Sequence, residues 1–204
     1  QIRGLNMATK NANDGLSMLG VIENATNDVT DMLHRMRELA IQATNDTNGT
    51  EDRAFLQKEV AELIKEIDRV ATQTQYNGQT VLDGTFSSKS IQVGTESGQK
   101  ITFSVNGIKT DAIGTAADAS ASPAVVESDV ADINISTAAG AQSGLQVITD
   151  AIEQVAGDRA TYGALQNRLE YTVSNLMNVA EFTTAARSRI EDADFAAESA
   201  RLAK

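Results

Sequence analysis

The chain has 204 residues, a length that suits one domain or two small ones with a buried core. Its net charge of −11 leaves no basic stripe that could neutralise phosphates, so we expect neither nucleic acid nor an anionic membrane as a partner. Cysteine and tryptophan are absent and aromatic residues make up 4%, which excludes thiolate chemistry and favours closely packed helices over a thick globular core. No apolar run approaches the roughly 20 residues of a membrane span.

Residues 5–44 carry an apolar seam whose members are separated alternately by three and four residues. An average step of 3.5 residues keeps one stripe of a helix facing one partner, and ordinary globular helices do not sustain it for so long. The pattern therefore predicts one long helix. The seam consists of Leu5, Ala8, Ala12, Gly15, Leu19, Ile22, Thr26, Val29, Leu33, Met36 and Ala40.

A turn and a second helix are predicted to follow. Residues 45–50 have the Asn, Asp and Gly content of a turn. Thr50 is the expected N-cap, and Glu51 and Asp52 suit the positively polarised first turn of a helix. A helix of about 20 residues can fold back on the first as an antiparallel pair. Its apolar positions are Leu56, Val60, Leu63, Ile67 and Val70.

The repeat then changes from about 3.5 residues to two. Segments 90–94 and 101–105 alternate as strands do, and residues 96–99 predict the turn that joins them. The dipeptides Asn77-Gly78 and Asn106-Gly107 are turn signals as well. Residues 112–141 are rich in Ala, Ser and Asp, which predicts an extended loop with one short strand near residues 130–135.

A second long seam begins after residue 143 and continues to residue 187 or beyond. Like the first, it predicts a helix long enough for a coiled coil. We therefore predict a mainly α fold with a small β-subdomain, in which a long antiparallel helical rod accompanies a β-hairpin region. The second seam consists of Leu145, Ile148, Ile152, Val155, Arg159, Tyr162, Gln166, Leu169, Val173, Leu176 and Ala180.

Five sequence blocks make the pattern more specific. They span residues 11–15, 33–43, 66–78, 163–169 and 186–198, and the last reads ARSRIEDADFAAE. In content, order and spacing these blocks resemble those of the bacterial flagellins. They cover both long helices and the second helix, whereas the β region is similar only in style.

The resemblance implies the structural subunit of the bacterial flagellar filament, a motility protein that is secreted and lies in the extracellular flagellum. Its implied partners are other flagellin subunits and the flagellar export apparatus, with no cofactor and no enzymatic activity. We expect one elongated rod domain, with N-terminal helices in residues 1–75, the β-hairpin region and loop in 76–141, and the C-terminal helix in 142–204. We also expect a core without a large outer domain and without most of the terminal polymerisation helices, because both ends fall within helical sequence.

The resemblance further implies a surface for vertebrate toll-like receptor 5. The matching positions depart from the family at three places, where Leu63 replaces a basic residue and His34 and Glu62 replace amides. A charged pair between Arg35 and Glu59 on neighbouring helices, beside Leu39, would suit a protein–protein anchor. The implied receptor residues are His34, Arg35, Leu39, Gln42, Leu56, Glu59, Glu62 and Leu63.

Charged residues near the C-terminus form the family's most specific signature. Arg187 and Arg189 can pair with Glu191, Asp192 and Asp194 at helical spacing, and these acids lack the glycine-containing loop of a calcium site. His34 is the single histidine, with neither a nucleophile nor further ligands recognisable beside it, so we expect a solvated position and no metal or catalytic site.

Two alternatives stay open at this stage. A hook–filament junction protein shares rod-like ends with flagellins, and a secreted coiled-coil adhesin or effector tip protein would show similar seams. Polymerisation into tubes would distinguish a filament subunit from an effector.

Overall fold

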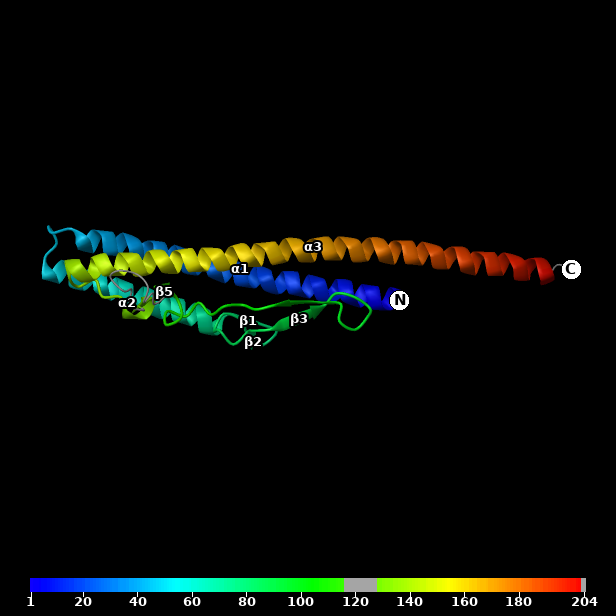
Figure 1. The fold of residues 1–204 in the computed structure, drawn as a ribbon, viewed down its shortest axis with the longest axis horizontal. Coiled ribbons are helices and arrows are strands. Elements are labelled where there is room, and N and C mark those ends of the chain that lie inside the picture. The colour runs from blue at the N-terminus through cyan, green and yellow to red at the C-terminus, as the bar shows by residue number, and fades with distance from the viewer. Residues whose placement is uncertain (116–127, 203–204) are drawn as a thin grey trace, which may run out of the picture. The chain divides into compact units, whose positions relative to one another are not determined.

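The computed structural model describes residues 1–115 and 128–202, with side chains described as far as Glu191. The described residues form three α-helices, α1 (Ile2–Thr44), α2 (Thr50–Gln73) and α3 (Ala138–Leu202), which are labelled in Figure 1. The predicted mainly α fold with small β-hairpin regions is confirmed. The remaining elements are β1 (Gln75–Tyr76), β2 (Gln79–Thr80), β3 (Lys89–Gln92), β4 (Lys100–Phe103), β5 (Gly114–Thr115), β6 (Ser128–Asp129) and the 3₁₀ helix η1 (Val130–Asp132).

The residues group into two compact units, and α1 and α3 contribute to both. Unit 1 contains Gln1–Ser17, Ser90–Thr102 and Ala164–Lys204. Unit 2 contains Met18–Lys89 and Phe103–Gly163.

The seam of α1 is buried along its whole length. All eleven predicted positions are buried, from Leu5 in unit 1 to Ala40 in unit 2. Small residues let neighbouring chain segments approach closely: at Gly15, an added Cβ would lie 3.3 Å from Cδ1 of Leu169. Burial of one stripe stabilises a helix far more than its intrinsic propensity does, which explains how α1 tolerates Gly15 and Gly20.

The seam of α3 is buried with a seven-residue repeat. Its fully buried members recur every seven residues, and the members between them are half-buried, including the polar Arg159 and Gln166. This heptad repeat is typical of a helix that packs along one continuous stripe. The fully buried positions are Ile148, Val155, Tyr162, Leu169 and Leu176.

The start of α2 differs from the prediction. Gly49, not Thr50, occupies the N-cap, and its backbone N–H donates to the Asp52 carboxylate at 2.9 Å. A carboxylate at the third helical position can accept a hydrogen bond from this N–H, whatever side chain the N-cap residue carries. Later in α2, Arg53 donates to the backbone oxygen of Ala43 at 2.8 Å, as the predicted antiparallel pairing of α1 and α2 requires.

Of the three turns predicted after α2, two are present. Asn77 and Gly78 both have positive φ, as a two-residue hairpin between β1 and β2 requires. Gln99 donates its N–H to the Glu96 carbonyl at 3.3 Å in the loop between β3 and β4. The predicted turn at Asn106-Gly107 is wrong, because the chain forms neither a turn nor a bend there, and an added Cβ at Gly107 would lie 3.0 Å from the backbone of Gly84.

The segment between β4 and α3 is held mainly by helix side chains, all within unit 2. Three side chains of α3 spaced by four residues contact it in antiparallel order. Asp150 accepts from the Thr115 hydroxyl at 2.6 Å, Gln154 accepts from the Gly114 N–H at 3.3 Å, and Asp158 accepts from the Asn106 amide at 2.7 Å. On α2, Asp68 accepts both the N–H and the hydroxyl of Thr110, at 2.8 and 2.9 Å. The bond to the Thr110 N–H satisfies a backbone donor that a wider sheet would otherwise satisfy.

The predicted loop over residues 112–141 is more structured than expected where it is described. The strand predicted near residues 130–135 is wrong: β6 lies just before it and pairs antiparallel with β5, and η1 follows. Gln57 of α2 receives the Ile135 N–H at 2.7 Å and donates to the Ile133 carbonyl at 3.3 Å. Residues 116–127 of the predicted loop lie outside the described residues.

The heptad burial of α3 predicts unequal effects of two similar substitutions. Ile148→Ala should lower the free energy of unfolding by about 2–5 kcal/mol, because the side chain is fully buried. Ile152→Ala, at a half-buried position one turn later, should cost clearly less. Urea denaturation of the two variants measures this difference, and equal losses would contradict the proposed orientation of α3.

Tyr162 predicts a loss of stability at high pH. Its ring is buried and its oxygen accepts the Asn106 N–H at 3.0 Å; burial raises its pKa to about 12. The unfolded chain loses this proton near pH 10, before the folded chain does. The free energy of unfolding should therefore fall between about pH 10 and 12, by at most about 1.4 kcal/mol per pH unit from this group.

Urea denaturation at a series of alkaline pH values measures that slope in matched variants. Tyr162→Phe should reduce the slope, and Tyr171→Phe should leave it unchanged, because Tyr171 is exposed. The same slope in the parent chain and in Tyr162→Phe would rule out the contribution of Tyr162.

Candidate functional site

The eight residues of the predicted receptor surface lie on α1 and α2 in unit 2, which we call the α1–α2 surface. α1 supplies the first four and α2 the last four, and the antiparallel pairing brings the two groups together. The α1–α2 surface consists of His34, Arg35, Leu39, Gln42, Leu56, Glu59, Glu62 and Leu63.

Arg35 links the two helices. Its Nε donates to Glu59 on α2 at 2.8 Å, and its Nη1 donates to Glu38 on α1 at 3.0 Å. The hydrogen bond to Glu59, followed by that to Glu38, raises the pKa of Arg35 above its usual value. Both carboxylates thus bind the guanidinium, while about half of the Arg35 side chain stays exposed. Glu38 was not predicted, although its spacing of three residues from Arg35 could have indicated it.

Leu39 does not lie where the prediction requires. It is 1% exposed and belongs to the buried core, so it supports the α1–α2 surface from beneath instead of offering an apolar anchor. Leu56 and Leu63 are half-buried. His34, Gln42 and Glu62 are exposed, and Glu62 accepts from Lys65 at 2.7 Å.

The exposed apolar group on this side of α2 is Phe55, which the sequence analysis missed. Its residue is 65% exposed, and Lys58 Nζ lies 5.3 Å from its ring centroid. Glu51, Glu59 and Glu62 share its side of the helix at spacings of four and seven residues. The α1–α2 surface is therefore acidic, with one exposed aromatic ring beside it. Phe55 falls outside the predicted apolar positions of α2, and a large apolar residue off the seam is the sequence signal that could have identified it.

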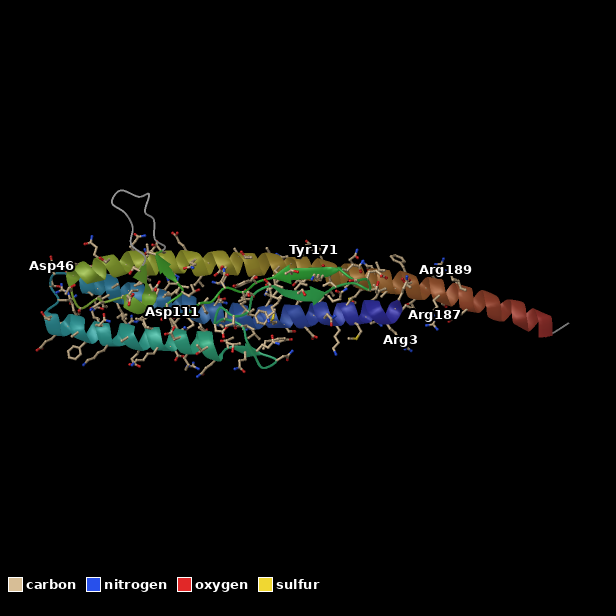
Figure 2. The ribbon with its side chains drawn as sticks, turned by 60° about the horizontal axis from the view of Figure 1, so that its bottom comes forward. Arg3, Asp46, Asp111, Tyr171, Arg187 and Arg189 are labelled. Atoms are coloured by element: carbon tan, nitrogen blue, oxygen red, sulfur yellow. The ribbon has the colours of Figure 1, made fainter. Side chains whose placement is uncertain are left out.

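The predicted charged signature lies on α3. Arg187 donates its Nε to Glu191 at 2.7 Å, which confirms one intrahelical pair at the predicted spacing. Figure 2 labels Arg187 and Arg189, and both are exposed. The side chains of Asp192 and Asp194 lie outside the described residues, so their pairing stays a prediction.

Neither a metal site nor a membrane span is found in the part of the chain that the structure describes. Within it, no three His, Asp or Glu side chains are placed to share a metal ion. None of its helices has an apolar stretch of the length needed to cross a bilayer.

Comparisons with known proteins match both helical regions. The family profile described as the bacterial flagellin N-terminal helical region matches residues 1–87, and the one described as the C-terminal helical region matches residues 145–204. The flagellin of Halalkalibacterium halodurans is 39% identical over 198 residues, which cover 97% of this chain and 68% of that protein.

Solved structures agree with this match. The crystal structure of Bacillus cereus flagellin is 29% identical with a TM-score of 0.66, covering 82% of this chain and 88% of that one. A flagellar hook-associated protein of Legionella pneumophila has a TM-score of 0.69 at 12% identity, covering 92% of this chain and 96% of that one. At 12% identity, the similarity to the hook-associated protein shows only a shared fold.

Proposed function

Because the chain belongs to the bacterial flagellin family, we propose that its α1–α2 surface is a ligand of vertebrate toll-like receptor 5. Flagellins polymerise into the flagellar filament, so this chain is a structural filament subunit, and the family is not an enzyme family. The filament is an extracellular structure. The identity of 39% to a flagellin, against 12% to a hook-associated protein, favours the filament subunit over a junction protein.

The proposal includes export through the flagellar export apparatus, since the subunit is assembled outside the cell. Cysteine is absent from the chain, so no disulfide can form that would hinder the passage of an extended polypeptide.

The observation that carries the receptor proposal is the exposed bridge from Arg35 to Glu59. Arginine is enriched among the residues that dominate binding energy, and its five donors can serve a partner while Glu59 and Glu38 fix its direction. The bridge itself contributes little to stability, because exposed ion pairs are typically worth 0–1 kcal/mol. The half-exposed guanidinium of Arg35 is thus directed by two carboxylates and still accessible to a partner.

The chemistry of the α1–α2 surface specifies the partner surface. Glu59 and Glu62 are complementary to basic residues on the receptor. The exposed Phe55 ring beside them is complementary to an apolar residue. Leu63, Glu62 and His34 differ from the basic and amide residues of the family. We therefore propose weaker recognition by receptors that depend on those positions.

A reporter cell line that responds to toll-like receptor 5 tests the proposal. Arg35→Ala should reduce potency on the order of tenfold or more, as expected for a central arginine in an interface. Arg69→Ala is the matched control: Arg69 is equally exposed on α2 and also pairs with a glutamate three residues away, Glu66, but lies outside the α1–α2 surface. The control should retain full potency.

Folding can be separated from recognition in the same experiment. Both substitutions are at exposed positions, so the free energy of unfolding should change by less than about 0.5 kcal/mol in each. Equal potency of Arg35→Ala and Arg69→Ala in folded protein would remove the α1–α2 surface as the receptor ligand.

A further inference from the structure

The dipeptide Asn-Gly occurs at three places in this chain, as Asn48-Gly49, Asn77-Gly78 and Asn106-Gly107. It has a chemistry of its own. The backbone nitrogen that follows an asparagine can attack the carbon of the side-chain amide, and glycine hinders this attack least because it has no Cβ. The three sites share the same reacting atoms, so the structure decides which of them reacts in the folded chain.

The reacting groups of Asn77-Gly78 are unrestrained. Both residues are exposed at the tip of the β1–β2 hairpin, with φ of 50° and 75°. Among the described residues, none is hydrogen-bonded to the Asn77 side chain. An added Cβ at Gly78 would meet no atom within 4 Å. The side-chain amide of Asn77 is therefore free to turn toward the Gly78 nitrogen.

The hairpin that carries this site also opens at little cost. It has two residue pairs, which join residues 75–76 to residues 79–80. A two-stranded hairpin is marginally stable by itself, and local opening of such a unit leaves the rest of a fold intact. Just beyond it, the Val81 N–H donates to the Thr74 carbonyl at 3.2 Å, which keeps the ends of the hairpin together when its tip opens.

Asn106-Gly107, in contrast, is restrained at both reacting groups. The side-chain nitrogen of Asn106 donates to Asp158 at 2.7 Å, and an added Cβ at Gly107 would lie 3.0 Å from the Gly84 backbone. The flanking residues Val105 and Ile108 are buried, and their N–H groups donate to backbone carbonyls at 2.9 and 3.0 Å. Reaction at this site therefore requires core residues to leave their positions.

Asn48-Gly49 is restrained by the start of α2. The Gly49 nitrogen, which would attack, donates its N–H to the Asp52 carboxylate at 2.9 Å. The side-chain nitrogen of Asn48 donates to the Gln42 carbonyl. Both reacting groups thus have partners, and these hydrogen bonds must break before the two groups can meet.

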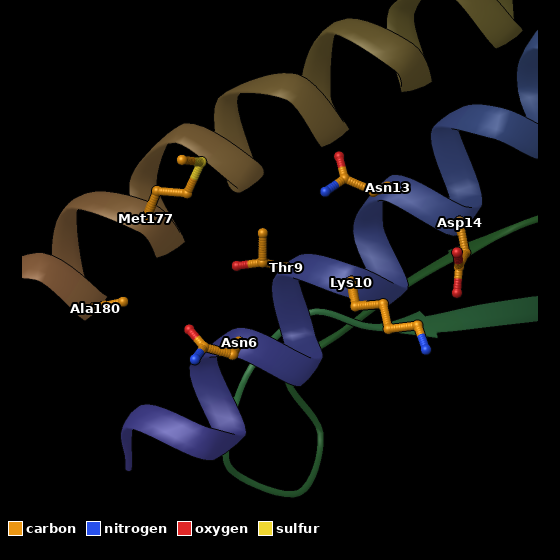
Figure 3. A pocket seen from close by; sticks show the side chains of 7 residues that line it. All are labelled: Asn6, Thr9, Lys10, Asn13, Asp14, Met177 and Ala180. Atoms are coloured by element: carbon orange, nitrogen blue, oxygen red, sulfur yellow. The ribbon is translucent and has the colours of Figure 1, made fainter.

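Asparagines within helices are restrained in another way. Figure 3 shows Asn6 and Asn13, which line an open groove together with Met177 of α3. Both are exposed, but the nitrogen that follows each of them belongs to the α1 backbone, where its N–H donates to the carbonyl four residues earlier. Neither is followed by glycine. Exposure alone therefore does not make an asparagine reactive.

We propose that Asn77 is a site of spontaneous deamidation in the folded chain, and that the fold protects Asn48 and Asn106. The Gly78 nitrogen loses its proton to hydroxide and bonds to Cγ of Asn77, and the side-chain nitrogen leaves as ammonia. Water then opens the resulting succinimide ring at one of its two carbonyls, which yields aspartate or isoaspartate. The reaction consumes water and releases ammonia, and neither an oxidant nor a reductant takes part.

The modification changes both charge and backbone. Either product adds a carboxylate to a chain whose net charge is already −11. Isoaspartate also lengthens the backbone by one carbon, which a two-residue turn between paired strands does not accommodate. Because the ammonia is lost to the solvent, the modified fraction grows with the age of the chain. The modification depends neither on filament formation nor on the receptor.

Peptide mapping of the unmodified chain tests the proposal. The folded chain is kept in mildly alkaline buffer, sampled over time and digested with trypsin, which cleaves after Lys and Arg. Separate peptides carry the three sites, namely residues 38–53, 70–89 and 101–109. Mass spectrometry measures the conversion of amide to acid, and fragmentation assigns it to one asparagine. Asn77 should react on the order of tenfold faster than Asn48 and Asn106, because no hydrogen bond of its side chain has to break.

The same chain unfolded in guanidinium chloride is the matched control, and its three sites should react at similar rates. Asp52→Ala removes the acceptor of the Gly49 N–H, so it should speed the reaction at Asn48 and leave the rate at Asn77 unchanged. Equal rates at the three sites of the folded chain, or no product at Asn77, would overturn the proposal. A preference for Asn77 that persists in guanidinium chloride would overturn it as well, because the fold would then not be the cause.

Discussion

The buried seam with its 3.5-residue spacing is the constraint on which the rest of the structure depends. In α1 all eleven seam positions are buried, and in α3 the buried positions recur every seven residues from Ile148 to Leu176. A helix of 43 or 65 residues has no other source of comparable stability, because propensity and exposed ion pairs contribute only tenths of a kcal/mol per residue or pair. The small side chains in the α1 seam, Ala8 and Ala12, leave little apolar volume per layer, so the core must be long to be stable.

The seam also determines which faces remain for function. α1 and α2 bury their apolar residues, and their exposed side carries Arg35, Glu59 and Glu62. Other polar side chains of α2 and α3 bind the segment between β4 and α3. In unit 1, the exposed residues of α3 outside the seam include Tyr171 and Phe182. Burial inside a subunit and contact outside it are therefore assigned to different sides of the same helices.

Sequence patterns predicted the features that depend on local periodicity. Both seams, the α1–α2 pairing and the Asn77-Gly78 hairpin follow from spacing or from one dipeptide, and the structure confirms them. Two of the errors share a cause, which is that distant residues decide the local conformation. Asn106-Gly107 is held out of a turn by hydrogen bonds to Tyr162 and Asp158 and by the close approach of Gly84. Leu39 faces inward because α1 buries residues beside its seam as well. No local pattern in the sequence indicates such long-range contacts.

A one-residue insertion tests the seam most directly. Adding one alanine after Gly157 in α3 rotates every later residue by about 100° relative to the earlier ones, so Val155 and Tyr162 can no longer occupy one stripe. Gly157→Ala is the matched control, because its Cβ would meet no atom within 4 Å. The urea unfolding midpoints of the two chains provide the measurement. The seam predicts that the insertion costs several kcal/mol, on the order of two lost core side chains, while the control is unchanged or more stable. An insertion variant as stable as the control would contradict the claim that the structure depends on the buried seam.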